Sequence, residues 1–467
     1  MFFQHVYEKG LAQASYIIGC QASKTAIVID PKRDIDTYID IAAREHLNIT
    51  YVAETHIHAD FLSGAQELVD ASGAELLLSD EGGPEWQYQF PHTGLHAGDV
   101  FMVGNIKFEV LHTPGHTPEH ISFLVTNTPA GDYPIMVFTG DFVFVGDIGR
   151  PDLLEKAAGI TGTQEVGARD MFASLHQFNA LPDYVQVWPG HGAGSACGKA
   201  LGAVPSSTVG YEKQTNWAMQ YDDQDAFVDA LLAGQPEPPK YFAMMKQLNK
   251  TTRPLATTLT TPKQLTVDEV DRAMSNGMPV IDTRDKTVFG QHHIPGSVNI
   301  QDIRSFSTWA GWILDYETPF VIVAAPHRMP EIVKALIRIG LDHIYGYIPD
   351  IEDWIKTEKP VASVTEISPH DLNDALGRGR AQVIDVRGSA EYQQGHIANA
   401  LHIHVGELMD YIHRLPSDKP LVVQCETGDR SAIAYSLLAK HGVQNLLNLS
   451  GGIQAWLNKG YDVQNAA

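Results

Sequence analysis

The stretch "THIHADFLSG" (residues 55–64) holds two histidines and an aspartate, and it follows the apolar run "NITYVAE" (48–54). A β-rich run of this length is typical of a strand. Imidazole and carboxylate side chains directly after a strand indicate a metal site at the edge of a sheet. Phe61 follows the aspartate, and its apolar ring offers no ligand atom. The stretch therefore predicts a metal site in which one ligand position is closed.

Three further segments run from an apolar strand into a loop that carries histidine or aspartate. They are "IKFEVLHTPGHT" (106–117), "YPIMVFTGD" (133–141) and "YVQVWPGH" (184–191). Because strand ends converge on one edge of a sheet, we expect these loops to meet the stretch 55–64. The candidate metal ligands are His56, His58, Asp60, His116, Asp141 and His191.

A longer unit occurs twice after the Pro-rich segment "GQPEPPK" (234–240). "MPVIDTRDKTVFGQHHIPGSVNI" (278–300) and "AQVIDVRGSAEYQQGHIANALHI" (381–403) share the order strand, Asp-x-Arg, helix, His-Ile, strand. The repeat of roughly 100 residues exceeds the 20–50 residues of a solenoid period, which indicates a domain duplication. Strand and helix alternate, so we expect a parallel α/β sheet in each copy.

The chain is therefore expected to be a multidomain α/β protein, because 467 residues exceed a single hydrophobic core. We expect a metal-binding domain over 1–205, a helical extension and linker over 206–261, a first repeat over 262–358 and a second repeat over 363–463.

The segment "VVQCETGDRSAIAYSLLAKHG" (422–442) places Cys425 between a buried-type strand and a helix. The loop from Cys425 to Arg430 can turn its main-chain N–H groups inward at the helix N-terminus. Those dipoles and Arg430 would stabilise a thiolate or a persulfide anion, which makes the cysteine a usable nucleophile at neutral pH. We expect Cys425 and Arg430 to be catalytic, and Glu426, Thr427, Gly428 and Asp429 to bind substrate.

The order H-x-H-x-D, G-H-T, T-G-D and a late G-H resembles the metallo-β-lactamase family over roughly residues 1–205. The resemblance implies an αββα fold. Most hydrolases of that family place a histidine after the motif aspartate to hold a second zinc, whereas this sequence has Phe61. The one-metal branch that it resembles is the persulfide dioxygenases, which implies one Fe(II) per chain on His56, His116 and Asp141. His58, Asp60, Phe61 and His191 would then surround and orient the ligands.

Two histidines and one carboxylate suit non-haem Fe(II) with open positions, whereas structural zinc prefers four protein ligands. Arg150, in "GDIGRPD" (146–152), could hold a substrate carboxylate or thiolate, and a surface salt bridge is the alternative. Cys197 follows the late histidine in a Gly-rich turn. Its thiol could reach the substrate, and plain packing as a buried cysteine is the alternative.

The block "DVRGSAEYQQGHIANA" (385–400), taken with the cysteine loop, resembles a rhodanese over about residues 363–463. A phosphatase is the rival interpretation, although phosphatase loops place one residue more between cysteine and arginine. The first repeat has Ala324 where the second has Cys425. Residues 262–358 are therefore expected to form an inactive rhodanese-like copy.

Taken whole, the chain resembles persulfide dioxygenase–rhodanese fusion proteins of sulfide detoxification. The resemblance implies Fe(II)-dependent oxidation of a low-molecular-weight thiol persulfide by O₂ and water to sulfite and thiol. Sulfane-sulfur transfer would interconvert sulfite and thiosulfate. The alternatives are a zinc-dependent thioester hydrolase of the glyoxalase II type with an appended sulfurtransferase, and a non-catalytic sulfur carrier or sensor. A homo-oligomer is compatible with the sequence.

The composition of the chain argues against some classes of partner and indicates a cellular compartment. The net charge is −23 and the chain has no basic run, which argues against nucleic acid and anionic lipid. No apolar stretch approaches the roughly 20 residues that span a bilayer, and the first residues lack the pattern of a signal peptide. Three cysteines cannot form a disulfide framework. We therefore expect a cytoplasmic protein.

Overall fold

The computed structural model describes residues 1–153, 155, 162–195, 197–199 and 201–465. The chain divides into two compact units, Met1–Leu259 with Ile337–Gly340, and Thr260–Leu336 with Leu341–Ala467. In the part of the chain that is described, no helix is both long and apolar enough to cross a membrane.

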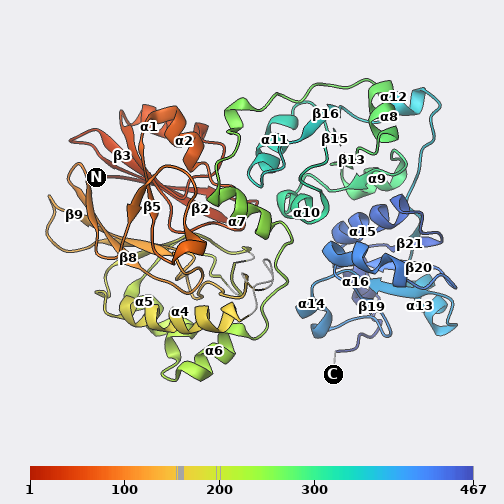
Figure 1. Cartoon of the computed structure of the whole chain (residues 1–467). Coiled ribbons are helices and arrows are strands. Elements are labelled where there is room, and N and C mark those ends of the chain that lie inside the picture. The colour runs from red at the N-terminus through yellow and green to blue at the C-terminus, as the bar shows by residue number, and fades with distance from the viewer. Residues whose placement is uncertain (154, 156–161, 196, 200, 466–467) are drawn as a thin grey trace. The chain divides into compact units, whose positions relative to one another are not determined.

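The first unit is built on two six-stranded sheets (Figure 1). One contains, in hydrogen-bonded order, β1 (Phe2–Glu8), β2 (Gln13–Cys20), β3 (Thr25–Ile29), β4 (Asn48–Ala53), β5 (Glu75–Ser79) and β6 (Thr93–Leu95). The other contains β12 (Ser207–Thr208), β11 (Gln186–Pro189), β10 (Met136–Gly140), β9 (Ile121–Asn127), β8 (Ile106–His112) and β7 (Val100–Val103). Tyr16 and Ile27 of the first sheet join Phe108, Phe123 and Phe138 of the second in one buried cluster.

Helices cover the outer faces of both sheets (Figure 1). The amphipathic helices α1 (Asp36–Arg44) and α2 (Ala65–Ser72) bury Tyr38, Ile41 and Leu68 against the first sheet. α4 (Thr163–Asn179) buries Met171 and Phe178 in a cluster with the second sheet. These layers confirm the αββα fold. The unit also contains η1 (Pro84–Trp86), α5 (Val209–Thr215), η2 (Trp217–Gln220), α6 (Gln224–Leu232), α7 (Phe242–Lys250) and η3 (Ala256–Thr258).

The second unit holds two parallel sheets, as the repeat predicts. The first repeat has the order β14 (Val298–Asn299), β13 (Val280–Asp282), β15 (Phe320–Val323), β16 (Ile344–Ile348). The second has the order β17 (Glu366–Ile367), β21 (Leu446–Leu449), β20 (Leu421–Gln424), β18 (Gln382–Asp385), β19 (Leu401–His402). Their helices are α8 (Val267–Ser275), α9 (Lys286–Gln291), α10 (Phe306–Ile313), α11 (Met329–Ile337), α12 (Glu352–Lys356), α13 (Pro369–Gly377), α14 (Ser389–Gln394), η4 (Val405–Arg414), α15 (Asp429–Lys440) and α16 (Gly452–Asn458).

The two copies use the same internal contacts. In the second copy Arg387 pairs with Asp385 at 2.7 Å, and the rings of Tyr392 and His396 stack at 3.8 Å. In the first copy Arg284 pairs with Asp282, and Phe289 stacks on His293 at 3.9 Å. The shared Asp-x-Arg and His-Ile motifs therefore stabilise each fold from within.

Candidate metal centre and sulfur-transfer loop

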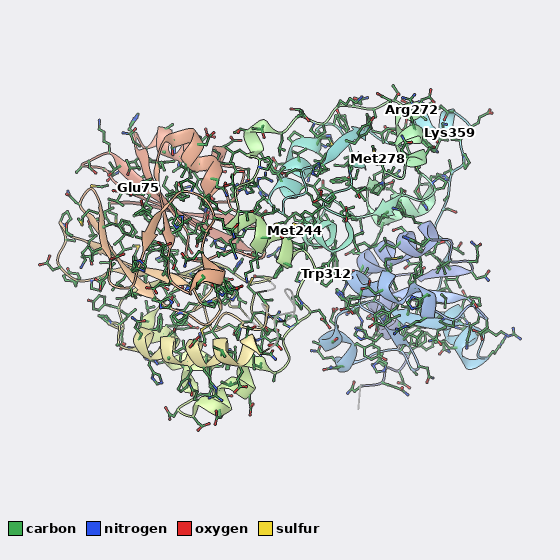
Figure 2. All side chains as sticks on the ribbon, in the orientation of Figure 1. Glu75, Met244, Arg272, Met278, Trp312 and Lys359 are labelled. Atoms are coloured by element: carbon green, nitrogen blue, oxygen red, sulfur yellow. The ribbon has the colours of Figure 1, made fainter. Side chains whose placement is uncertain are left out.

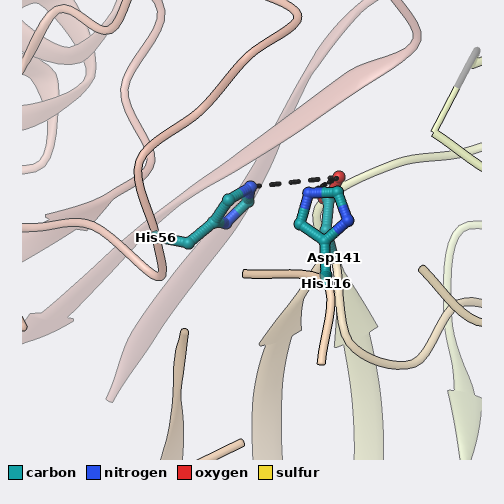
Figure 3. A group of neighbouring side chains, drawn as sticks. All are labelled: His56, His116 and Asp141. Atoms are coloured by element: carbon teal, nitrogen blue, oxygen red, sulfur yellow. Dashed lines mark ion pairs between the residues drawn. The ribbon is translucent and has the colours of Figure 1, made fainter. Parts of the chain in front are cut away.

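His56, His116 and Asp141 meet at the ends of strands from both sheets (Figure 3). Their ligand atoms lie within 4.8 Å of one another, and all three side chains are buried. Nε2 of His116 is 3.6 Å from Oδ2 of Asp141, and Nε2 of His56 is 4.0 Å from the same oxygen. The structure thus brings together the three residues that the resemblance assigns to a metal.

Hydrogen bonds set the tautomer of both histidines. The hydroxyl of Thr55 donates to Asp30 at 2.9 Å and therefore accepts from Nδ1 of His56 at 3.0 Å. Nδ1 of His116 donates to the main-chain oxygen of Arg150 at 3.0 Å. Each ring is consequently left with an Nε2 lone pair directed toward Asp141, as in histidines that bind metals.

The polar atoms of this cluster are poorly satisfied without a cation. Nε2 of His56 and Oδ2 of Asp141 are buried and have no hydrogen-bond partner among the described residues. Burial lowers the pKa of His56 and of His116, so that both rings stay neutral. A buried carboxylate facing two neutral lone pairs is costly unless a positive charge lies between them. The donor set therefore fits a divalent metal ion.

His120 supports two of these ligands, although no spacing pattern marks it in the sequence. Its Nε2 accepts from the main-chain N–H of Asp141 at 3.2 Å, and its Nδ1 lies 2.8 Å from the hydroxyl of Thr113. Its ring stacks on His56 with the centroids 5.1 Å apart. Burial lowers the pKa of His120 well below its ordinary value, which keeps Nε2 an acceptor.

His58 turns away from the three-residue cluster. Its Nε2 lies 3.1 Å from Asp30 and 3.2 Å from Glu54. Burial lowers the pKa of His58, but the two carboxylates outweigh it, and the pKa lies well above its ordinary value. Phe61 packs on the His58 ring at 4.4 Å and is itself buried. Sequence reasoning missed Asp30 and Glu54, whose signal is an acidic residue at the end of an apolar strand.

Asp60, His191 and Cys197 form a neighbouring group of buried side chains, with ligand atoms within 4.8 Å of one another. Nδ1 of His191 faces the carbonyl of Ala12 at 3.1 Å. Its Nε2 lies 3.2 Å from Asp60 and 3.5 Å from Asp141. Burial and the two nearby aspartates raise the pKa of Cys197 well above its ordinary value.

In the second unit, Cys425 lies between β20 and α15, as predicted. The N–H of Gly428 donates to its sulfur at 3.1 Å. The carbonyls of Cys425 and Glu426 accept N–H groups from the start of α16, at 2.8 and 3.2 Å. Arg430 does not point freely into the loop, because Glu391 holds its guanidinium at 2.5 and 2.7 Å. In the first repeat, Ala324 directly follows β15, as Cys425 directly follows β20, and it is buried.

Comparisons with known proteins agree with the two kinds of domain that carry these sites. The model of the metallo-beta-lactamase superfamily matches residues 9–191, and that of the rhodanese-like domain matches residues 266–357 and 368–459. The crystal structure of a metallo-beta-lactamase from Staphylococcus aureus is 42% identical and covers 74% of this chain and 98% of its own, with a TM-score of 0.68. This is a metallo-beta-lactamase superfamily protein with two rhodanese-like domains.

Two further proteins are similar to about half of this chain. A hydroxyacylglutathione hydrolase from Glaesserella parasuis is 30% identical over 238 residues, which are 46% of this chain and 91% of the relative. The crystal structure of ETHE1 from Myxococcus xanthus is 26% identical and covers 50% of this chain and 91% of its own, with a TM-score of 0.41.

Arg150 of the metallo-beta-lactamase domain is fully buried. Its guanidinium forms two bonds of 2.7 Å to Asp152 and a third of 2.7 Å to the carbonyl of Pro236. Its main-chain oxygen is the acceptor that orients His116. Arg150 thus contributes to the metal cluster through its backbone, and contact between its side chain and a substrate stays a prediction.

The segment expected to be a linker supports the metal motif of the metallo-beta-lactamase domain. The hydroxyl of Tyr241 donates to the carbonyl of Asp60 at 3.1 Å. Arg253 donates to the carbonyl of Ser63 and pairs with Glu67. Asn249 of α7 bonds the same loop through its side chain. No local pattern in the sequence indicates these contacts.

Proposed function

We propose that the metallo-beta-lactamase domain is a mononuclear Fe(II) persulfide dioxygenase. The observation that carries the proposal is the buried cluster of His56, His116 and Asp141, whose ligand atoms lie within 4.8 Å of one another and include atoms of His56 and Asp141 without a hydrogen-bond partner among the described residues. These three residues would hold Fe(II), which would supply the redox chemistry that oxidation of a persulfide by O₂ needs. A persulfide, O₂ and one water would give sulfite and the free thiol.

The chain's own residues would prepare this chemistry. Thr55 and the carbonyl of Arg150 fix the two imidazoles, and His120 fixes the backbone of Asp141. Phe61 is buried against the His58 ring and offers no ligand atom to a second metal. Ligands oriented in this way, with no donor at position 61, favour one metal ion over a pair.

We propose further that the second rhodanese-like domain transfers sulfane sulfur. The Cys425 thiolate would attack the outer sulfur of thiosulfate, the S–S bond would break, and sulfite would leave with the electron pair. The resulting persulfide anion would be stabilised by the N–H of Gly428, which already points at the cysteine sulfur. Run in reverse, the same step would consume sulfite made at the metal.

A zinc-dependent thioester hydrolase is the second candidate. It is supported by the group Asp60, His191 and Cys197, which could hold another cation, and by the similarity to a hydroxyacylglutathione hydrolase. Phe61 argues against it, because the hydrolases that the sequence resembles use a histidine there.

The test is oxygen uptake by the Fe(II)-loaded full chain with the persulfides of glutathione, cysteine and coenzyme A, with sulfite and thiosulfate quantified. We expect uptake by the wild type and none by His116→Ala, which should keep thiosulfate:thiol sulfur transfer. Cys425→Ser should show the converse. His176→Ala, at an exposed histidine of α4, is the control. Oxygen uptake by His116→Ala would contradict the proposal, and thioester hydrolysis by the zinc form without any oxygen uptake would favour the second candidate.

A further inference from the structure

The charged side chains of the Cys425 loop do not favour an anionic substrate. Between the cysteine and Arg430 it carries two acidic residues, Glu426 and Asp429. The loop's single arginine is already paired with Glu391. Thiosulfate and sulfite are oxyanions, and like charges in a partly buried site repel them. A further cation near the loop would offset this repulsion.

The first rhodanese-like copy, which lacks the cysteine, supplies such a cation. Nζ of Lys286 lies 2.6 Å from Oδ1 of Asp429 and donates to the carbonyl of Thr427 at 3.0 Å. A Cβ added to Gly428, which has φ +113°, would lie 3.4 Å from Cδ, Cε and Nζ of the lysine. The Lys286 side chain therefore lies along the residue whose N–H contacts the cysteine sulfur.

Buried contacts between the two copies hold Lys286 in this place. The main-chain N–H of Asn299 in β14 donates to the hydroxyl of Ser436 in α15 at 3.1 Å, and both residues are buried. The ring of Trp312, labelled in Figure 2, packs on His404 of the second copy with the centroids 4.9 Å apart. The main-chain N–H of Lys286 is itself fixed by Gln301 at 3.0 Å.

The second copy has no lysine at the position that corresponds to Lys286. Counted from the stacked histidines, His293 and His396, the position of Lys286 corresponds to Ser389 in the second copy. Glu391, which holds Arg430, corresponds to Val288 in the first copy. The first copy thus lacks the cysteine and the arginine-holding glutamate, and it has a lysine aimed at the other copy's loop.

We propose that Lys286 is a positioning residue of the Cys425 site, by which the copy without a cysteine draws sulfur oxyanions to the copy that has one. The lysine neutralises Asp429, fixes the carbonyl of Thr427, and lowers the repulsion that thiosulfate meets. The inference rests on the proposed sulfur transfer, and it gives the first copy a role in substrate selection.

The decisive experiment needs no turnover. Cys425 of the full chain is alkylated with iodoacetate, an anion, or with iodoacetamide, a neutral reagent of similar size, and the labelled peptide is quantified by mass spectrometry. The rate with iodoacetate divided by the rate with iodoacetamide reports the local charge at Cys425. Changes in the accessibility of the cysteine affect both rates and therefore cancel in this ratio. We expect Lys286→Gln to lower this ratio about fivefold at low salt and less at 1 M salt. Lys286→Arg should keep the ratio within about twofold, because it keeps the charge.

Two further variants serve as controls for the alkylation ratio. Lys356→Gln removes an exposed lysine of the same copy, paired with Asp353 at 3.0 Å, and should leave the ratio unchanged. Asp429→Asn removes the negative charge and should raise the ratio. A ratio unaffected by Lys286→Gln would overturn the inference.

Steady-state kinetics give a second readout. We expect Lys286→Gln to raise the KM for thiosulfate about fivefold with kcat within about twofold of wild type. A fall in kcat at unchanged KM would overturn the anion-attracting role. Absence of sulfur transfer in the wild type would refute the proposed function of the domain, while the alkylation ratio would still test the lysine.

Discussion

The side-chain amide nitrogen of Asn249 lies 2.8 Å from the carbonyl oxygen of His58, across 191 positions of sequence. The same nitrogen lies 2.7 Å from the carbonyl of Phe61, and the amide oxygen accepts the N–H of Ser63 at 2.8 Å. One side chain therefore satisfies three main-chain groups of the loop that carries the metal motif. Its removal would leave buried polar groups without partners.

We expect Asn249→Ala to weaken metal binding about tenfold or more, because the loop that orients His56 and Asp60 loses its support. Equilibrium dialysis against a chelator, followed by metal analysis, measures the loss. Gln247→Ala, at an exposed position of the same helix, is the matched control and should bind metal as the wild type does. Equal metal retention by the two variants would show that the loop holds its shape without Asn249.

Phe61→His should raise the metal content from one ion per chain toward two. The new imidazole would join Asp60 and His191, which already lie together and carry a buried oxygen without a hydrogen-bond partner among the described residues. Metal analysis of protein purified with excess zinc tests this. Phe61→Leu, which adds no donor atom, should stay at one ion. A stoichiometry of one in the histidine variant would remove Phe61 as the reason for a mononuclear site.

Glu67→Gln should destabilise the first unit by roughly 3–5 kcal/mol at pH 7, because it leaves the buried arginines without their carboxylate. Arg253 reaches both oxygens of Glu67 at 2.6 and 2.9 Å, and Nε of Arg33 lies 2.9 Å away. Burial raises the pKa of Glu67, but the arginines outweigh it and lower the pKa below its ordinary value of 4.5.

The stability lost in Glu67→Gln depends on pH because folding lowers the pKa of Glu67. A lowered folded-state pKa means that the stabilisation is complete above pH 4.5 and disappears as the pH falls through the folded-state pKa. Urea unfolding should therefore show the gap between wild type and Glu67→Gln shrinking in acid. Glu165→Gln, which breaks an exposed pair with Arg169, is the control and should unfold as the wild type does at either pH.

Arg430→Lys should slow sulfur transfer roughly tenfold, because an ammonium group cannot reproduce the paired bonds to Glu391. The measurement is thiosulfate:thiol transferase activity at saturating thiosulfate. Arg414→Lys, at an exposed residue of the same domain, should leave that activity unchanged. A fully active Arg430→Lys would mean that the loop needs only a positive charge at this position.

The sequence was sufficient to predict those parts of the fold and of the site that depend on local patterns of residues. Apolar runs that end in histidine or aspartate predicted the strand ends carrying His56, His116 and Asp141, and the repeat predicted two parallel sheets. Ala324 was placed opposite Cys425 by simple alignment of strands. These features need only local patterns and the comparison of one repeat with the other.

What the sequence could not indicate depends on contacts between distant segments. Asp30 and Glu54 pair with His58. The ring of His120 accepts a hydrogen bond from the main-chain N–H of Asp141. The bond between Lys286 and Asp429 joins residues 143 positions apart. Side-chain partners of this kind follow from three-dimensional packing, and no periodicity records them.

The contacts of Asn249 and Arg253 have a practical meaning for anyone who wishes to transplant the metal-binding half into another protein. A gene fragment that ended at residue 205 would encode every histidine and aspartate of the cluster, yet it would omit the helix that braces their loop. The compact unit is Met1–Leu259 together with Ile337–Gly340, and a graft ending at residue 205 would carry the metal-binding residues without the contacts that hold their loop in place.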